Sequence, residues 1–368
     1  MNPADPSSLD DSLIADSAAR LFAERVNKDQ RLRTEAGEFD AALWRRLVDS
    51  GFPLLLASEA AGGIGAGWRA AYPLLRGVGY WQVPMPLAET LLAALLTSLA
   101  GFDLPDLATA PLTLIEQGRG NTLLAEGSGA ALRLSGTAHA VPWARHAQAA
   151  LLSLADGRLA LLPLQGAAGV TLQPHVNHAG LPSDTLQLAG ARISALAANP
   201  LALREPVWTL GAVARSAMLV GALESALAQA VRYAGERVQF GKPIGKNQAI
   251  QQQLALMAGD VAAARTAALV ACSDAPDSLV ADCHATVFSA AVAKVRAGEA
   301  ATRGSAIAHQ VHGAIGFTQE HALHFATRRL WAWREEFGTD AFWALVLGRA
   351  AIVAGADGFW PAITRKQF

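Results

Sequence analysis

Cysteine is the scarcest residue type in this chain of 368 residues, which contains only Cys272 and Cys283. The two cysteines lie on different stretches with helical periodicity. A disulfide framework or a zinc cluster needs more thiols than this. We therefore expect no structural disulfide and no metal, and a reducing, cytoplasmic location.

An excess of charge of either sign is also missing. The formal net charge of −1 provides no electrostatic attraction for nucleic acid or for an acidic membrane surface. Residues Met1–Asp11 lack the basic start and the apolar core of a secretion signal. The most apolar run, Leu91–Leu99, is shorter than the roughly 20 residues that span a bilayer. We therefore expect neither nucleic acid nor a membrane as partner.

The spacing of the apolar residues changes twice along the chain. In residues 1–110 they recur at the spacing of amphipathic helices, and between 111 and 199 they alternate between glycine-containing turns. From 200 to 368 long helical stripes return, with Pro206 at an expected helix start. We therefore predict an α+β fold of three domains with these boundaries: an N-terminal helical domain, a middle antiparallel β domain, and a C-terminal bundle of four-helix type.

Residues Arg237–Gln253 have a composition suited to a phosphate-bearing ligand. One helical pattern ends just before Arg237 and another begins near Gln248, which leaves a compact turn between them. Arg237 has a forked set of donors that matches phosphate oxygens, and Phe240 has an apolar face. From these residues alone, a helix-to-helix turn with a solvated arginine remains an equal alternative.

A second turn-forming segment, Gln310–Glu320, follows about one helical hairpin later. Together, and in this order, the two segments resemble the dinucleotide-binding segments of acyl-CoA dehydrogenases. Leu43–Pro53 resembles the entry helix of the same family, so the resemblance covers nearly the whole chain. It implies the fold of that family and FAD as cofactor, whose adenine and pyrophosphate end is held across a subunit boundary. The cofactor-binding residues that it implies are Arg237, Gln239, Phe240, Gln248, Gln310, Gly313 and Thr339.

The resemblance also implies a reaction and a position for the base. In the family a glutamate removes a proton from the α carbon of an acyl-CoA thioester, while a hydride leaves the β carbon for the flavin. The two known positions of this glutamate fall on Phe337 and Gly211, which cannot accept a proton. The nearest acids are Glu335 and Glu336. Because a shift of one residue on a helix turns a side chain by about 100°, we interpret both as surface acids; a displaced base at Glu336 or Glu335 is the alternative.

The segments expected to cover the flavin ring depart from the family as well. Ile115–Asn121 and Ala140–Trp143 stand where active members have a conserved loop and strand. Pro142 would remove a backbone donor and Ala140 a stacking ring, and Trp143 would compensate only in a shifted register. The chain therefore keeps the implied contacts to the adenine end of FAD, while those to its reactive ring are weakened.

Some bacterial family members, notably those that degrade steroid side chains, are heterotetramers, and this chain resembles one of their two kinds of subunit. One subunit keeps the base, and the other supplies the adenine and pyrophosphate contacts and the dimer interface. Our leading hypothesis is a subunit of this second kind, which takes part in α,β-desaturation of an acyl-CoA with a homologous catalytic partner and with electron-transfer flavoprotein as acceptor. A self-sufficient homo-oligomeric enzyme and a non-enzymatic scaffold remain alternatives.

Two histidine pairs have the i, i+3 spacing that places side chains on one helical face: His309 with His312, and His321 with His324. Such spacing is compatible with a metal site. Gly313 and Gly316 interrupt this face, and no aspartate or cysteine joins it. We therefore predict that these histidines do not hold a metal.

Overall fold

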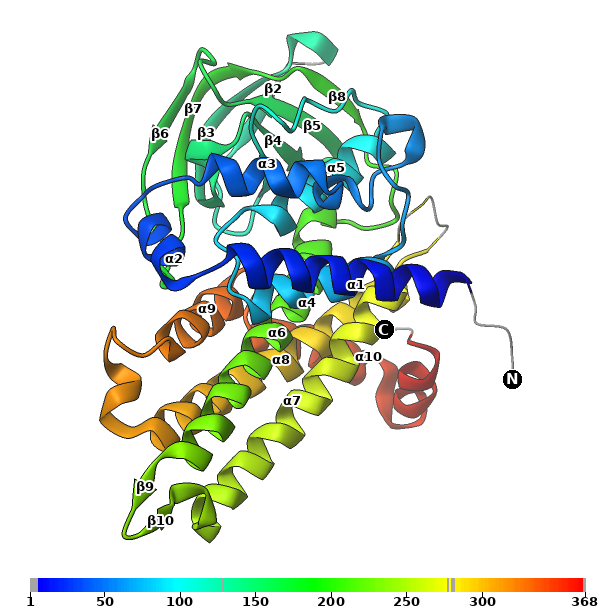
Figure 1. The fold of residues 1–368 in the computed structure, drawn as a ribbon. Helices are drawn as coiled ribbons and strands as arrows, with labels where there is room; N and C mark the ends of the chain where they lie inside the picture. The colour runs from blue at the N-terminus through cyan, green and yellow to red at the C-terminus, as the bar shows by residue number, and fades with distance from the viewer. Residues whose placement is uncertain (1–5, 128, 277, 279–281, 367–368) are drawn as a thin grey trace.

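The structure is a computed structural model that describes residues 6–127, 129–276, 278 and 282–366. Figure 1 shows a β region at one end, long helices that run to a hairpin at the other end, and the first helices alongside both. The order of helices, strands and helices is the one that the spacing of apolar residues predicts. The fold is therefore α+β, as expected.

The N-terminal part consists of five α-helices and two short 3-10 turns. Asn27 and Asp40 cap the second and third helices, since their side-chain oxygens accept hydrogen bonds from the backbone N–H groups of Gln30 and Leu43. The buried side chains of Trp44 and Leu47 then face the core. The helices are α1 (Pro6–Arg25), α2 (Lys28–Glu35), α3 (Ala41–Asp49), α4 (Trp68–Tyr80) and α5 (Leu87–Leu99).

The middle part contains two four-stranded sheets, with the strand orders β1-β4-β5-β8 and β2-β3-β7-β6. The strands are β1 (Leu112–Glu116), β2 (Leu124–Glu126), β3 (Arg133–Pro142), β4 (Ala149–Ser153), β5 (Arg158–Pro163), β6 (Val170–Gln173), β7 (Ser183–Arg192) and β8 (Ala195–Ala198). All pairings are antiparallel except β1 with β4, which is parallel. Alternation of apolar residues does not fix strand direction, and β2 and β3 lie in the crossover between β1 and β4.

The C-terminal part is a helical bundle whose members are α6 (Pro206–Glu236), α7 (Gln248–Asp274), α8 (His284–His312), α9 (Leu323–Glu335) and α10 (Asp340–Arg365). Two-residue strands, β9 (Val238–Gln239) and β10 (Lys242–Pro243), form the turn between α6 and α7. The helix start at Pro206 and the helix boundaries on both sides of this turn lie where the sequence predicts them.

Glycines allow α4 and α6 to cross in direct contact. A Cβ atom on Gly79 would lie 1.9 Å from the carbonyl oxygen of Met218, and one on Gly221 would lie 1.9 Å from that of Arg76. No side chain fits at such distances, so alanine at either position would push the helices apart. This contact fixes the N-terminal helices on the C-terminal bundle.

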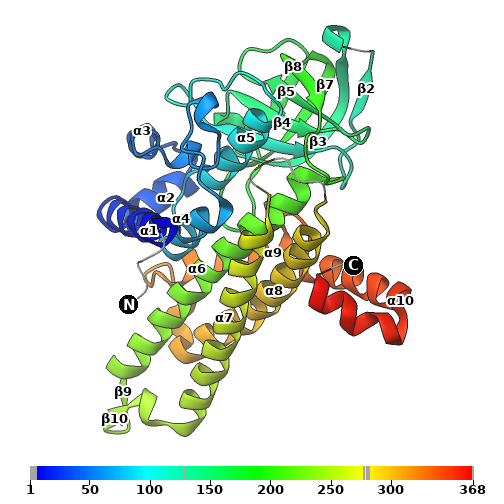
Figure 2. The same ribbon diagram turned by 90° about the vertical axis from the view of Figure 1, so that its right-hand side faces the viewer.

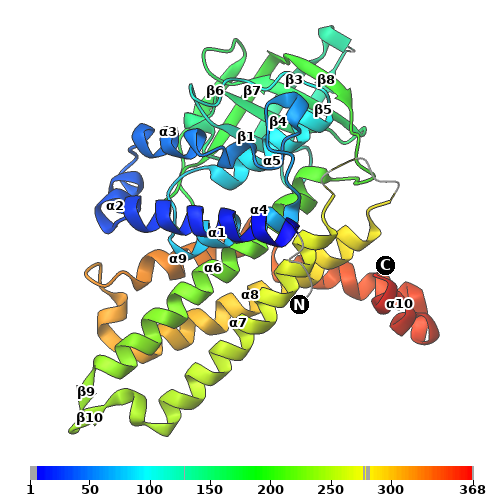
Figure 3. The same cartoon turned by 45° about the vertical axis from the view of Figure 1, so that its right-hand side comes forward.

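Helix α10 breaks at Gly355, and its two halves lie to one side of the bundle (Figures 2 and 3), where Lys366 pairs with Asp274 of α7. Its surface is apolar: Ile352 is 82% and Val353 88% exposed. By length and composition, α6, α7 and the stretch Leu323–Arg365 are each apolar enough to cross a membrane. In α6 the apolar window is 89% buried, against 28% in α7 and 6% in the last stretch. These stretches are longer than Leu91–Leu99, the run that is most apolar by sequence.

Candidate functional site: two ends of the bundle

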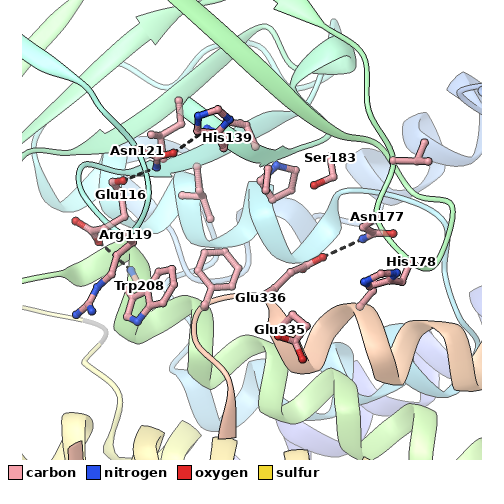
Figure 4. Close-up of a pocket in the computed structure, with 18 residues that line it drawn as sticks. Glu116, Arg119, Asn121, His139, Asn177, His178, Ser183, Trp208, Glu335 and Glu336 are labelled. Carbon is pink, nitrogen blue, oxygen red and sulfur yellow. Dashed lines mark hydrogen bonds between the residues drawn. The ribbon is translucent and has the colours of Figure 1, made fainter. Parts of the chain in front are cut away.

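The residues singled out from the sequence gather at two separate places. One is a cavity of about 490 Å³ between the β region and the upper ends of α6 and α9 (Figure 4). The other is the opposite end of the bundle, where the turn between α6 and α7 lies near the end of α8 (Figure 1). We call these places the cavity end and the hairpin end.

At the cavity end, the two positions expected for the base lie against each other. Gly211 is on α6, and a Cβ atom added to it would lie 2.4 Å from the Phe337 ring. The ring of Trp208 lies 6.1 Å from that of Phe337, edge to face. An aromatic ring therefore fills the space between the two positions where the resemblance implies a carboxylate.

Phe337 has a left-handed backbone, with φ of +53°, which is uncommon for a bulky residue. Its carbonyl oxygen accepts a hydrogen bond of 2.9 Å from Trp343 Nε1, and the Arg215 guanidinium lies 5.4 Å from the centre of its ring. Neighbouring groups therefore hold Phe337 in a conformation that the chain alone disfavours.

Glu336 is not the surface acid that the sequence led us to expect. Its two carboxylate oxygens accept hydrogen bonds from Arg215 Nε at 2.6 Å and from Asn177 Nδ2 at 2.9 Å. It also lines the cavity, because α9 ends at Glu335 and Glu336 has an extended backbone, to which the 100° helical rotation does not apply. Glu335 also lines the cavity, but its side chain is half exposed and its contact to Arg334 is long. A carboxylate with both oxygens engaged is a poor proton acceptor.

A buried ionic network surrounds Glu336. Arg215, only 2% exposed, also pairs with Glu89 from α5. Burial opposes the charge of Arg215, but the carboxylates of Glu89 and Glu336 more than offset this effect and raise its pKa. Lys294 donates hydrogen bonds to the carbonyl oxygens of Trp333 and Glu336 at the end of α9, and burial lowers its pKa to about 7. The network joins α5, α6, α8 and α9 around the cavity.

Glu116 is a cavity residue that sequence reasoning did not single out as a site. It ends β1, and its Oε2 accepts a hydrogen bond of 2.9 Å from the backbone N–H of Trp208 in the first turn of α6. Burial raises the pKa of Glu116 to about 8. The sequence gives one signal for this contact: Glu116 is an acid at the end of an apolar stretch, and a helix starts elsewhere in the chain. Its contact shows a helix-capping role.

The loop after β1 is likewise tied to the start of α6. Arg119 pairs with Glu205, and its guanidinium lies 5.1 Å from the ring centre of Trp208 and 4.6 Å from that of Phe342. Asn121 donates a hydrogen bond to the carbonyl oxygen of Glu116. The polar groups of this loop are therefore bonded mostly to the protein itself.

Strand β3, which is expected beside a flavin ring, has a register shift between Ala138 and Val141, but this shift does not bring Trp143 into the cavity. Trp143 is 3% exposed, and its ring packs against Phe39 and His146 instead of lining the cavity. Ala140 and Pro142 do line it. The tryptophan therefore does not replace the lost stacking ring.

At the hairpin end, the predicted residues point outward. Arg237, Gln239 and Gln248 are exposed, and Phe240 is 101% exposed at the tip, with φ of +53°. A fully exposed phenylalanine with a left-handed backbone is unfavourable for an isolated chain. The hairpin is therefore suited to insertion into another molecule.

The second predicted segment reaches the same end of the bundle. Tyr233, one turn before Arg237, stacks on His312 with ring centres 4.7 Å apart. Gln310 is exposed, and Gly313 has φ of +63° at the end of α8. The structure therefore brings Arg237 and Gln310 to the same end, although they are far apart in sequence. A hollow of about 390 Å³ contains Gln310 and Gly313 in its lining.

Thr339 does not join this group. Its Oγ1 accepts a hydrogen bond of 3.0 Å from the backbone N–H of Phe342 and caps the N-terminus of α10, beside Phe337. The structure thus gives Thr339 a helix-capping contact at the cavity end.

The histidines near the hairpin end form stacks with neighbouring rings. His309 stacks on Phe317 and contacts Thr327 Oγ1 at 3.0 Å, and burial lowers the pKa of both His309 and His312. Within the described ranges, no group of three or more His, Cys, Asp or Glu could hold a metal.

Comparison with known proteins gives this geometry a family. The profile described as acyl-CoA dehydrogenase, C-terminal domain, matches residues 208–352. Acyl-CoA dehydrogenase FadE27 of Mycobacterium tuberculosis is 32% identical over 307 residues, which cover 78% of this chain and 81% of FadE27. The chain belongs to the acyl-CoA dehydrogenase family. This acyl-CoA dehydrogenase is therefore an oxidoreductase of a family that acts on acyl-CoA with FAD as cofactor.

Solved structures of two assemblies resemble it over almost its full length. The ChsE4-ChsE5 complex from Mycobacterium tuberculosis contains a chain 26% identical, with a TM-score of 0.80, that covers 93% of this chain and 97% of its own. A variant of the Tcur3481-Tcur3483 steroid acyl-CoA dehydrogenase has a chain 27% identical, with a TM-score of 0.84, that covers 95% of this chain and 99% of its own.

The two ends of this acyl-CoA dehydrogenase differ in how well they fit FAD. At the hairpin end, Arg237 presents free donors, Gln310 an exposed carboxamide, and Phe240 an apolar face, which together suit a pyrophosphate and an adenine. At the cavity end, Pro142 lacks a backbone donor and Phe337 fills the base position. The residues fit the adenine end of the cofactor and do not complete a site for its reactive ring.

Proposed function

We propose that this acyl-CoA dehydrogenase is the subunit of a heteromeric enzyme that lacks the base. It would supply Arg237, Gln239, Phe240, Gln248, Gln310 and Gly313 to the adenine and pyrophosphate end of a FAD whose ring lies in a homologous partner chain. The observation that carries this proposal is the packing of Phe337 on Gly211, because it occupies both family positions for the base. The FadE27 relative and the two assemblies above support the assignment.

The partner chain would provide the chemistry that this chain lacks. FAD, when bound, accepts a hydride from the β carbon of an acyl-CoA, and a carboxylate of the partner would take the α proton. Arg237 would hold the pyrophosphate, and Phe240 would cover apolar surface near the adenine. Electron-transfer flavoprotein is the proposed acceptor, the cytoplasm the proposed location, and a tetramer the proposed assembly.

Uncovered apolar surfaces support an assembly with another chain. Leu256 on α7 is 67% exposed, and Trp360 on α10 is 68% exposed, in addition to Ile352 and Val353. A monomer that exposes this much apolar surface along two helices is prone to associate. We propose that a homologous subunit covers α7 and α10. The proposed substrate is an acyl-CoA of steroid or fatty-acid degradation, because one similar assembly is named a steroid acyl-CoA dehydrogenase.

The experiment that tests this proposal is the visible absorption spectrum of the chain alone and of the chain co-expressed with a homologous partner. We expect a colourless lone chain and a yellow complex with about one FAD for each pair of chains. In the complex, Arg237→Ala should release FAD, whereas Arg232→Ala, on the exposed surface of α6, should not. A lone chain with stoichiometric flavin that acyl-CoA bleaches would overturn the proposal.

The self-sufficient enzyme is a second candidate with one observation in its favour, since Glu335 and Glu336 both line the cavity. A base at Glu336 would first have to leave Arg215 and Asn177. The non-enzymatic scaffold is the third candidate, and a colourless complex would favour it over both others.

A further inference from the structure

Three arginines of α2 and α9 form a partly buried cluster that lies outside the lining of the cavity. Arg31 comes from α2, and Arg328 and Arg329 come from α9. Arg329 is 0% exposed. Phe325 places Arg31 and Arg329 close together, because its carbonyl oxygen accepts a hydrogen bond from Arg329 Nη1 and its ring lies 5.3 Å from the Arg31 guanidinium.

The hydrogen bonds of this cluster are incomplete. Arg329 Nε, Arg329 Nη2 and Arg31 Nε are buried and find no acceptor among the residues that the structure describes. Both ring nitrogens of the neighbouring His324 are also buried without a partner there. Guanidinium nitrogens can only donate, and the unpaired acceptor beside them, Glu35 Oε1, lies 4.0 Å from Arg329 Nη1 and does not bond to these nitrogens. An acceptor is therefore missing at Arg329 Nε, Arg329 Nη2 and Arg31 Nε. A buried donor without an acceptor costs on the order of 1–3 kcal/mol, and more for a charged group.

The charge of the cluster is unbalanced as well. Glu35 is the one carboxylate among the groups that act on Arg329, and its Oε2 is engaged by Arg328 at 2.7 Å. Its Oε1 lies 4.0 Å from Arg329 Nη1, beyond hydrogen-bond distance. Arg328 is partly exposed and pairs with Glu35, so Arg31 and Arg329 are the two guanidinium groups without a carboxylate at hydrogen-bond distance. Burial lowers the pKa of Arg31 to about 10 and that of Arg329 to about 9, so both remain charged at neutral pH.

A buried water and a buried anion would answer these two deficits differently. Water can accept the missing hydrogen bonds but does not cancel charge, and an uncompensated buried charge is far more costly than an unmade hydrogen bond. An anion does both. We propose that a small monovalent anion, chloride in the cell, binds between α2 and α9 to Arg31 and Arg329. Because Arg329 is 0% exposed, a small ion suits the site better than a phosphate ester.

The first test is the melting temperature of the full chain at constant ionic strength, with sodium gluconate replaced stepwise by sodium chloride, bromide or formate. We expect a saturable rise with chloride and bromide and none with gluconate. A rise with formate alone would instead assign the site to a carboxylate and overturn the halide. An equal response to all salts would show that the effect is ionic strength and that waters fill the site.

Three variants locate the effect. Arg329→Met should abolish the halide-specific rise. Glu35→Gln removes the carboxylate that acts on Arg329 and should lower the halide midpoint by about tenfold, since a negative charge near the anion is lost. Arg296→Met is the matched control, because Arg296 is an exposed arginine on α8 that pairs with Glu299. It should leave the halide response unchanged.

Anomalous scattering from bromide tests the anion site without any variant. We expect an anomalous peak within hydrogen-bonding distance of Arg329 Nε in crystals of the full chain grown in bromide. A peak at the hairpin end alone, or none between α2 and α9, would overturn the proposal.

Discussion

The cavity end and the hairpin end of the bundle differ in where their polar and aromatic groups find partners. At the cavity end, Arg215, Glu336 and Asn177 bond to one another, and Phe337 packs on Gly211. At the hairpin end, Arg237 and Phe240 project into solvent. The side chains at the cavity end find their partners within one chain, whereas Arg237 and Phe240 at the hairpin end remain open to another molecule. Resemblance to a catalytic family therefore does not by itself indicate which end of a chain still needs a ligand.

Breaking the ionic network of Arg215, Glu89 and Glu336 at the cavity end should have the largest effect on stability. Arg215→Met would leave Glu89 buried without its cation, which costs about 3–5 kcal/mol of unfolding free energy. Urea denaturation of the full chain measures this loss. We expect FAD binding by any folded fraction of the complex to be unchanged.

The matched control is Arg265→Met, since Arg265 is exposed and lies 4.0 Å from Glu224. Exposed pairs contribute about 0–1 kcal/mol, so its unfolding free energy should stay close to that of the wild type. If the two variants lost equal stability, the buried ion pairs of Arg215 would contribute no more than an exposed pair, which would contradict this prediction.

The second prediction concerns the hairpin end and leaves folding intact. Arg237→Ala should weaken FAD binding in the heteromeric complex by about 2–3 kcal/mol, the contribution of hydrogen bonds between charged groups. The unfolding free energy of the lone chain should not change, because Arg237 is exposed and its side chain makes no hydrogen bond or ion pair with the described residues. Flavin fluorescence on dilution measures the dissociation constant, and Arg232→Ala serves as the control.

The sequence predicts more of the hairpin end than of the cavity end. Turn composition and spacing predicted the hairpin, because Arg237, Phe240 and Gly241 act locally. The convergence of Phe337 and Gly211 was implied only by family spacing, since residues 126 positions apart meet through tertiary packing. The network of Glu89, Arg215 and Lys294 had no sequence signal, because it joins side chains from three helices.

Local reasoning also failed in identifiable ways. Glu336 was assigned to the surface because the helix was assumed to continue through it, but its extended backbone turns the carboxylate into the cavity. The parallel pairing of β1 with β4 could not be predicted from alternation, which is the same for either strand direction. The β2 and β8 strands, Leu124–Glu126 and Ala195–Ala198, are short, are not fully buried, and carry little alternation.

The third prediction uses the pH dependence of Glu116 at the cavity end. Its pKa is about 8 in the folded chain, against an ordinary value of 4.5, so the folded state keeps this proton as pH rises and the unfolded state loses it. The carboxyl group therefore favours folding least at high pH: its contribution falls between pH 4.5 and 8 by at most about 1.4 kcal/mol per pH unit.

Glu116→Gln should remove this dependence, because the amide oxygen still accepts the hydrogen bond from Trp208 and does not titrate. Relative to the wild type, the variant should gain stability steadily from pH 5 to pH 8 in urea denaturation. A constant difference over this range would mean that Glu116 is ionised in the folded chain.

The smallest effect is expected for Glu336→Gln, and it separates the leading proposal from the self-sufficient enzyme. In a heteromeric complex the base belongs to the partner, so desaturation of acyl-CoA should continue at a rate within about twofold of the wild type, while stability falls by about 1 kcal/mol through the weaker bond to Arg215. Glu335→Gln, which changes a half-exposed acid in the same cavity, should alter neither quantity. A base at Glu336 predicts the same loss of stability together with a rate reduced by a factor of 10² or more. Measuring both quantities on the same preparation decides between them, since a damaged fold lowers the amount of active complex without selectively abolishing turnover per bound FAD.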